Sequence, residues 1–190
     1  MMQLKKNRKS ILQDFKKALF CISLFCIFLT TFVSLPLCAN VFEKLMNETG
    51  KIVVTPNNLD SLNEAFNRGD RPPKTLHTLQ MDMLGLEFIP PWVFEAENLH
   101  TLGLFGNNLT SLPPDIGRLK ALQRLNLIFN KLTDLPAEIR GLKDLQYLDL
   151  EKNRLTYLPP EIGELKALKE LNLFRNQLTD LPAEIGGLKA

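Results

Sequence analysis

The chain has 190 residues, of which 45% are hydrophobic and 23% are charged, and its formal net charge is +2. Residues 1–39 hold six of the 23 basic residues and one of the 21 acidic residues, so residues 40–190 carry a net charge of −3. This balance leaves no polybasic surface, and we expect no nucleic-acid partner. All three cysteines precede residue 40, so the remaining chain has no disulfide, cysteine nucleophile or thiolate metal site.

Residues 1–39 are predicted to be a targeting segment. Six basic residues and one acidic residue occupy positions 1–17, and residues 18–38 contain no charge. This order is typical of a signal peptide, which would be cleaved after Ala39 to leave a chain beginning at Asn40. The apolar run is also long enough for an uncleaved membrane anchor, and lipidation of Cys38 is a third alternative.

Lipidation is the less favoured alternative because Pro36 and Leu37 stand where a lipobox carries small residues. The basic residues before the apolar run place the rest of the chain outside the cytoplasm in all three cases. We therefore expect an exported protein, either secreted or held at the cell surface or outer envelope. Only its N-terminal segment would contact a membrane.

Residues 40–75 differ in composition from the rest and are expected to form an N-terminal cap. Residues 51–55 are predicted to form a strand. Residues 59–66 are predicted to form a helix that opens at Asn58 or Asp60. Its apolar face carries Leu59, Leu62 and Phe66.

The tripeptide Arg68-Gly69-Asp70 follows this helix and precedes two prolines. One interpretation is a recognition site, because integrins bind this tripeptide. The alternative, and the favoured one, is an ordinary turn, since Gly-Asp and Pro-Pro are common turn sequences.

From Leu76 onward the chain repeats every 23 residues. The five units are residues 76–98, 99–121, 122–144, 145–167 and 168–190. The last four share the pattern L-x-x-L-x-L-x-x-N-x-L, and places in a unit are counted below from its first leucine. Self-similarity at this period indicates a solenoid.

Each unit mixes two hydrophobic periods. Leu148 and Leu150 alternate as in a strand, whereas Ile162 and Leu165 are three residues apart, as on a helical turn. One unit cannot bury its leucines alone, so the units must stack and their strands must form a parallel sheet. We predict an α/β solenoid with right-handed crossovers, a concave parallel sheet, and a proline step that turns each unit to the convex side.

The ninth place of the last four units is an asparagine, at Asn107, Asn130, Asn153 and Asn176. The chain leaves the strand here, and its peptide groups lose their partners in the sheet. An amide side chain has both donors and an acceptor for such groups. We therefore predict a structural role for these residues, in which each binds backbone groups of adjacent units.

These motifs resemble the leucine-rich repeat proteins of the 23-residue class. The stretch L-P-x-E-I-G-x-L-K is typical of bacterial members, and the chain is most similar to the secreted spirochaetal group. The resemblance implies a horseshoe that binds a protein ligand, although the same fold serves several unrelated functions.

The first and last units differ in how far they follow the common pattern. The first has Leu84 where asparagine is expected, and Trp92 in its outer half is well sized to close against the preceding segment. The last unit is ordinary and no capping segment follows it, so we expect an open edge. Such an edge favours self-association or pairing with another solenoid, and a truncated product is the other explanation.

Catalytic and metal-binding residues are scarce in the repeats. His77 and His100 share the second place of adjacent units, so stacking would bring them within ~5 Å of each other, but no third ligand is evident. We expect no catalytic residue, no metal and no cofactor. The acidic residues and lysines that recur in the outer half of each unit predict a solvent-exposed convex face.

The concave face carries the functional hypothesis. Its third, fifth, seventh, eighth and tenth places are not needed for the core, yet several hold aromatic or apolar residues beside cations such as Lys131 and Arg154. Aromatics next to arginines are typical of protein-binding hot spots. The alternative is that the rings pack on one another only to cover the sheet. The predicted protein-binding residues are Phe105, Arg124, Ile128, Phe129, Tyr147, Lys152, Phe174 and Arg175.

Overall fold

A computed structural model describes residues 45–47 and 49–188, and all structural statements below concern these residues. The predictions of a signal peptide, an anchor or a lipidated Cys38 lie outside them. Within the described part of the chain, no helix has both the length and the apolar character needed to cross a membrane.

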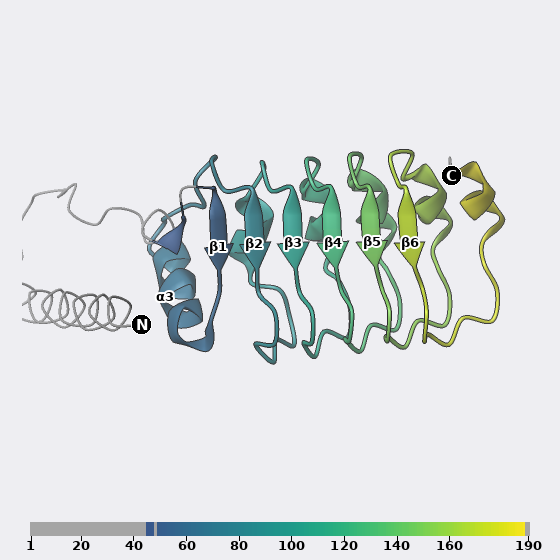
Figure 1. The fold of residues 1–190 in the computed structure, drawn as a ribbon, viewed down its shortest axis with the longest axis horizontal. Coiled ribbons are helices and arrows are strands. Elements are labelled where there is room, and N and C mark those ends of the chain that lie inside the picture. The colour runs from purple at the N-terminus through teal and green to yellow at the C-terminus, as the bar shows by residue number, and fades with distance from the viewer. Residues whose placement is uncertain (1–44, 48, 189–190) are drawn as a thin grey trace, which may run out of the picture. The chain divides into compact units, whose positions relative to one another are not determined.

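Six short strands form one parallel sheet, in the same order as in the sequence (Figure 1). From β2 onward, each strand pairs with the residues 23 positions further along, as Leu125 pairs with Leu148. This spacing confirms the parallel sheet predicted from the repeats. The strands are β1 (Lys51–Val53), β2 (Thr78–Gln80), β3 (Thr101–Gly103), β4 (Arg124–Asn126), β5 (Tyr147–Asp149) and β6 (Glu170–Asn172).

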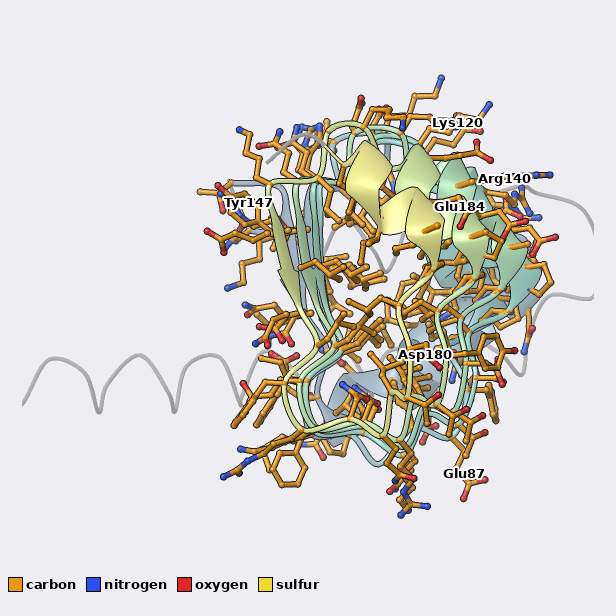
Figure 2. All side chains as sticks on the ribbon, turned by 90° about the vertical axis from the view of Figure 1, so that its right-hand side faces the viewer. Glu87, Lys120, Arg140, Tyr147, Asp180 and Glu184 are labelled. Atoms are coloured by element: carbon orange, nitrogen blue, oxygen red, sulfur yellow. The ribbon has the colours of Figure 1, made fainter. Side chains whose placement is uncertain are left out.

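Each return segment is a five-residue 3-10 helix on the side opposite the strands (Figure 2). A proline precedes each of these helices, and its fixed φ starts the turn. The predicted helical step is therefore present, in its tighter 3-10 form. These elements are η1 (Pro91–Glu95), η2 (Pro114–Arg118), η3 (Ala137–Gly141), η4 (Pro160–Glu164) and η5 (Ala183–Gly187).

The core lies between the strands and the 3-10 helices, where side chains fill the space (Figure 2). The middle residue of β3, Leu102, is fully buried, as is Ile116 of η2 on the other side. Only the middle of each three-residue strand points inward, so its first and third residues face out from the sheet. This alternation positions the outward side chains that form the candidate site.

The asparagines of the ninth place connect neighbouring units, as predicted. Asn130 donates from Nδ2 to the carbonyls of Leu104 and Leu127, at 2.9 and 3.1 Å, and its Oδ1 accepts from the Leu109 amide at 3.1 Å. Asn107 and Asn153 make the same set of contacts one unit away on either side. These buried amides pair peptide groups that the short strands leave unpaired.

The segment before the first unit begins differently from the prediction. Strand β1 ends at Val53, not at Thr55, and helix α3 (Pro56–Asn67) starts three residues earlier than predicted. Thr55 is the N-cap residue, and its amide donates to Oδ1 of Asn58 at 2.8 Å. Pro56 suits the first turn because its missing N–H would have no partner there.

Helix α3 covers the core of the first unit. Leu62 and Ala65 are fully buried, and Leu59 and Phe66 pack partly buried against the core, as predicted for the apolar face. Trp92 is also fully buried, and its indole N–H donates to Oδ1 of Asn63 in α3 at 2.8 Å. The prediction that Trp92 closes against the preceding segment is confirmed.

The tripeptide at residues 68–70 ends this helix. Gly69 has a φ of +102°, and its amide donates to the Phe66 carbonyl at 2.9 Å, while the Asp70 amide donates to the Ala65 carbonyl at 3.0 Å. This pair of bonds is the Schellman motif, in which glycine supplies the left-handed residue. The turn interpretation therefore accounts for this sequence.

The core is less covered in the last described unit. Leu181 is 53% exposed, although Leu158, at the same place one unit earlier, is 4% exposed. Leu171, Leu173 and Leu178 are likewise only partly buried. No strand pairs with the outer edge of β6 among the described residues.

We predict that Asn130→Ala lowers the free energy of unfolding by about 1 to 3 kcal/mol, because buried carbonyl and amide groups lose their partners. Urea denaturation measures this change. The control is Asn108→Ala, since the Asn108 side chain is less buried and makes one longer bond, 3.3 Å, to the Gly85 carbonyl. Equal losses in the two variants would contradict the structural role of the ninth-place asparagine.

Candidate functional site

The structure divides the eight predicted binding residues between two surfaces. Arg124 and Tyr147 are the first residues of β4 and β5 and pair directly across the sheet. The other six follow the ends of strands, because each strand covers only the third to fifth places of its unit. They are Phe105, Ile128, Phe129, Lys152, Phe174 and Arg175.

The sheet surface has a hollow of about 250 Å³, which we call the sheet hollow. Arg124 lies over the ring of Tyr147, with 4.9 Å between the guanidinium carbon and the ring centroid. Tyr147 points away from the core on the strand side (Figure 2). Asp82 and Asp149 also line this hollow, so its charges are mixed.

The loops after the strands are held by side chains of the fifth place. The side chain of Asn126 accepts from the Ile128 amide at 3.0 Å, and Asn172 accepts from the Phe174 amide at 3.1 Å. Such bonds between an Asn or Asp side chain and the amide two residues on favour a turn. The seventh-place residue is therefore fixed at the point where the chain leaves the sheet.

Gly103 has no side chain at the fifth place, and Asp82 of the preceding unit makes the bond instead. Oδ1 of Asp82 accepts from the Phe105 amide at 2.9 Å. A Cβ at position 103 would lie 2.9 Å from that oxygen, so glycine leaves room for the carboxylate. Phe105 is thus positioned by a residue from a different unit.

The eighth place has a left-handed backbone in every unit. Glycine adopts this conformation without strain, but of the five residues concerned only Gly106 is a glycine. For a bulky side chain such as that of Phe129 the conformation is unusual and costs about 1 to 2 kcal/mol. The φ values are 56° at Met83, 68° at Gly106, 61° at Phe129, 55° at Lys152 and 57° at Arg175.

Backbone bonds hold this conformation in a row along the loops. The Phe129 amide donates to the Glu151 carbonyl and the Lys152 amide to the Phe174 carbonyl, each at 2.9 Å. The eighth place of one unit thus binds the seventh place of the next. The side chains of the eighth place are consequently stacked from unit to unit along one edge of the sheet.

A hollow of about 620 Å³ follows this edge, and we call it the strand-exit groove. Its apolar part contains Met83, Phe105 and Phe129. Its cationic part contains Lys131, Lys152, Arg154 and Arg175, and no carboxylate is among the lining residues.

Phe129 joins the two parts of the groove. Its ring meets that of Phe105 edge to face, at 6.3 Å between centroids, and the Lys152 ammonium lies 5.0 Å from its centroid. Phe129 nevertheless remains 54% exposed. An exposed ring that is held between an aromatic and a cation suits recognition of a partner.

The groove thus gathers Phe105, Phe129, Lys152 and Arg175 of the predicted set, and the sheet hollow gathers Arg124 and Tyr147. Ile128 and Phe174 line neither hollow. Ile128 is half-buried, whereas Phe174 is exposed with Arg175 5.3 Å from its ring centroid.

Met83 was missed by the sequence analysis, although it occupies the eighth place of the first unit. Counting places through that atypical unit would have found it. Gly106 was also missed. A Cβ there would lie 3.1 Å from Cγ of Met83, so the glycine leaves room for the methionine side chain beside the next loop.

The two histidines lie as close as expected, with 4.9 Å between their ring centroids. The part of the chain that the structure describes contains no cluster of three or more His, Cys, Asp or Glu side chains that could hold a metal.

One short parallel strand per 23-residue unit, a ladder of buried asparagines and a proline-led 3-10 return define the leucine-rich repeat solenoid. The chain is a leucine-rich repeat protein with a horseshoe fold. Family models agree: the model described as leucine rich repeat matches residues 97–155, and that described as leucine rich repeats in two copies matches residues 143–186.

Solved structures with this fold come from different organisms. A leucine-rich repeat protein of Leptospira interrogans is 37% identical, with a TM-score of 0.63 over 73% of this chain and 34% of its own. InlP of Listeria monocytogenes is 30% identical, with a TM-score of 0.55 over 61% and 32%. The plant peptide hormone receptor RGFR1, in complex with RGF2, is 33% identical, with a TM-score of 0.53 over 72% and 21%.

The chain therefore spans about a third of the length of the two bacterial structures. A search of curated proteins gave no match. The chain resembles the spirochaetal protein in sequence and fold, as its motifs predicted.

The left-handed backbone at the eighth place leads to a prediction about stability. Arg175→Gly is expected to be more stable than Arg175→Ala by about 1 kcal/mol, because only glycine adopts a positive φ freely. At the exposed Arg154, which has no positive φ, the order should be reversed. Urea denaturation of the four variants measures both differences. If alanine is the better residue at position 175 too, the strain is absent.

Proposed function

We propose that this chain is a non-enzymatic, exported protein-binding module whose partner contacts the sheet hollow, the strand-exit groove and the exposed ring of Phe174, which lies beside Arg175 of that groove. The observation that carries the proposal is the half-exposed ring of Phe129, held between Phe105 and Lys152 over a hollow of about 620 Å³. The partner is a protein ligand at a host or cell-surface boundary.

The energetics of Phe129 favour binding over a purely structural role. The solenoid core is built from buried leucines and gains little from a ring that is largely in water. The left-handed backbone adds a cost at the same residue. Local costs of this kind are typical of functional sites, where a partner supplies the compensating contacts.

The fold and its relatives support the same class of function. Leucine-rich repeat domains typically serve as scaffolds for protein interaction and not as enzymes. The structure of RGFR1 is of a receptor complex with RGF2, which is an example of a solenoid that holds a peptide hormone. The similarity supports a protein or peptide ligand for this chain, and the side chains of its own groove determine which one.

The test is affinity capture of extracellular proteins with wild-type protein and with the double variant Phe129→Ser, Phe174→Ser. We expect the variant to lose the captured partner, since removing a hot-spot aromatic costs about 2 kcal/mol or more of binding energy. The thermal midpoint should be nearly unchanged because both rings are more than half exposed.

The chain provides a matched control in Tyr157→Ser, Phe88→Ser. Tyr157 is 55% exposed, close to the 54% of Phe129, and neither control ring lines the groove or the sheet hollow. Capture that is lost equally in both double variants would exclude these two surfaces as the binding site.

Export is the second part of the proposal. Residues 1–39 act as a signal peptide that is removed after Ala39. Mass spectrometry of the mature protein should give an N-terminus at Asn40. An N-terminus at Met1 would identify an uncleaved anchor instead, and a lipid-modified Cys38 would identify a lipoprotein.

The less covered last unit favours a second candidate function, which is assembly through that edge. Leu181 is exposed there, while its counterparts Leu112, Leu135 and Leu158 are buried by the following unit. Apolar residues beside an unpaired parallel strand favour pairing with another chain. Sedimentation equilibrium should then show dimers that Leu181→Glu dissociates. A wild-type monomer at high concentration would exclude this role.

A further inference from the structure

We infer that the strand-exit groove binds a short acidic protein segment that carries one aromatic or large apolar side chain. This inference rests on the proposed function and specifies the chemistry of the partner. It is drawn from the charges, the apolar contacts and the length of the groove.

Three of the four cations of the groove lack a carboxylate partner. Lys131, Arg154 and Arg175 have no carboxylate within 4.0 Å among the described residues, and Lys152 has only Glu151, at 3.5 Å. Four cations therefore face one hollow in a segment, residues 40–190, whose net charge is −3.

Some cations elsewhere on the molecule are paired with carboxylates. Arg118 lies 3.7 Å from Glu95 and 3.5 Å from Asp115, and Lys143 lies 3.4 Å from Glu164. Other cations outside the groove, such as Lys120 and Arg140, have no ion pair within the described part of the chain either, but the groove brings four cations to one hollow whose lining residues include no carboxylate. Charge complementarity across an interface requires an anionic ligand at this place.

The apolar part of the groove specifies the second element of the ligand. Met83 and Phe129 are both largely exposed, and Gly106 between them presents no side chain. The flexible thioether of methionine and the edge of an aromatic ring suit an inserted aromatic or aliphatic side chain. The apolar residue of the ligand then lies toward β2 and its acidic residues toward β6.

The length of the groove fits a short extended segment. Four steps between neighbouring units, from Met83 to Arg175, span about 19 Å at the strand spacing of ~4.8 Å. An extended chain of about six residues covers this distance at ~3.3 Å per residue.

A protein segment suits the groove better than a nucleic acid. Successive bases of a single strand stack on a row of aromatic rings, whereas the two rings that line this groove, those of Phe105 and Phe129, meet edge to face. The net negative charge of residues 40–190 also opposes a long polyanion beyond the groove.

The experiment measures fluorescence anisotropy of labelled six-residue peptides with the mature exported protein. The probe FGDEDE carries both predicted elements, AGDEDE lacks the ring, and FGNQNQ lacks the charges. We expect FGDEDE to bind about tenfold more tightly than either of the others, and its binding to weaken as salt is raised.

The matched variants separate the two elements. Arg154→Gln with Arg175→Gln should weaken FGDEDE by about tenfold and leave the weak binding of FGNQNQ unchanged. The control pair, Lys120→Gln with Arg140→Gln, removes the same charge from the side of the 3-10 helices (Figure 2) and should change neither. Thermal midpoints of both pairs should equal that of the wild type, since all four side chains are exposed and none forms an ion pair among the described residues.

Three results would overturn the inference. If FGDEDE binds no more tightly than FGNQNQ, an acidic ligand is excluded. If the groove variant and the control variant lose the same affinity for FGDEDE, the groove is excluded as the binding site. Tighter binding of a labelled oligothymidine that is lost in the Arg154, Arg175 variant assigns the groove to nucleic acid. If the Phe129, Phe174 variant still loses its captured protein in any of these cases, the proposed function stands and only the ligand chemistry is wrong.

Discussion

The buried asparagine of the ninth place is the constraint on which the rest of the solenoid depends. Asn130 bonds to carbonyls of its own unit and the preceding one, and it accepts the Leu109 amide, so it fixes both the turn and the stacking of units. The eighth residue stands directly before this anchor and must complete the turn out of the strand. Its left-handed backbone and outward side chain are consequences of that position.

The regular and irregular parts of the repeat therefore have different roles. Leucines, asparagines and prolines recur at every unit because each fills the same place in the core, the loop or the return. The side chain at the eighth place fills none of these positions, and along the solenoid this residue is in turn methionine, glycine, phenylalanine, lysine and arginine. A gradient from apolar to cationic surface is thus presented on a uniform backbone.

Much of the fold could be predicted from the sequence, because the 23-residue period fixes the strand register and Trp92 is recognisable as a closing residue. The predicted start of α3 is three residues too late, because the prediction takes Asn58 or Asp60 as the residue that opens the helix, whereas Thr55 is the N-cap and Pro56 begins the first turn. The sequence did not predict that the binding residues divide between the sheet hollow and the strand-exit groove. A phenylalanine in the sequence does not indicate a left-handed backbone. Only Gly106, at the eighth place of the preceding unit, indicates that this place has a positive φ.

The strand-exit edge combines two local costs. Bulky residues adopt a positive φ there, and four cations lie together, of which only Lys152 has a carboxylate partner among the described residues. Either feature alone is compatible with a stable solenoid, because the leucine core and the asparagine ladder stabilise it independently. Their coincidence in one hollow is explained by a partner that neutralises the cations and covers Phe129. The solenoid itself supplies only Glu151, to Lys152, and no acidic side chain is among the lining residues of the groove.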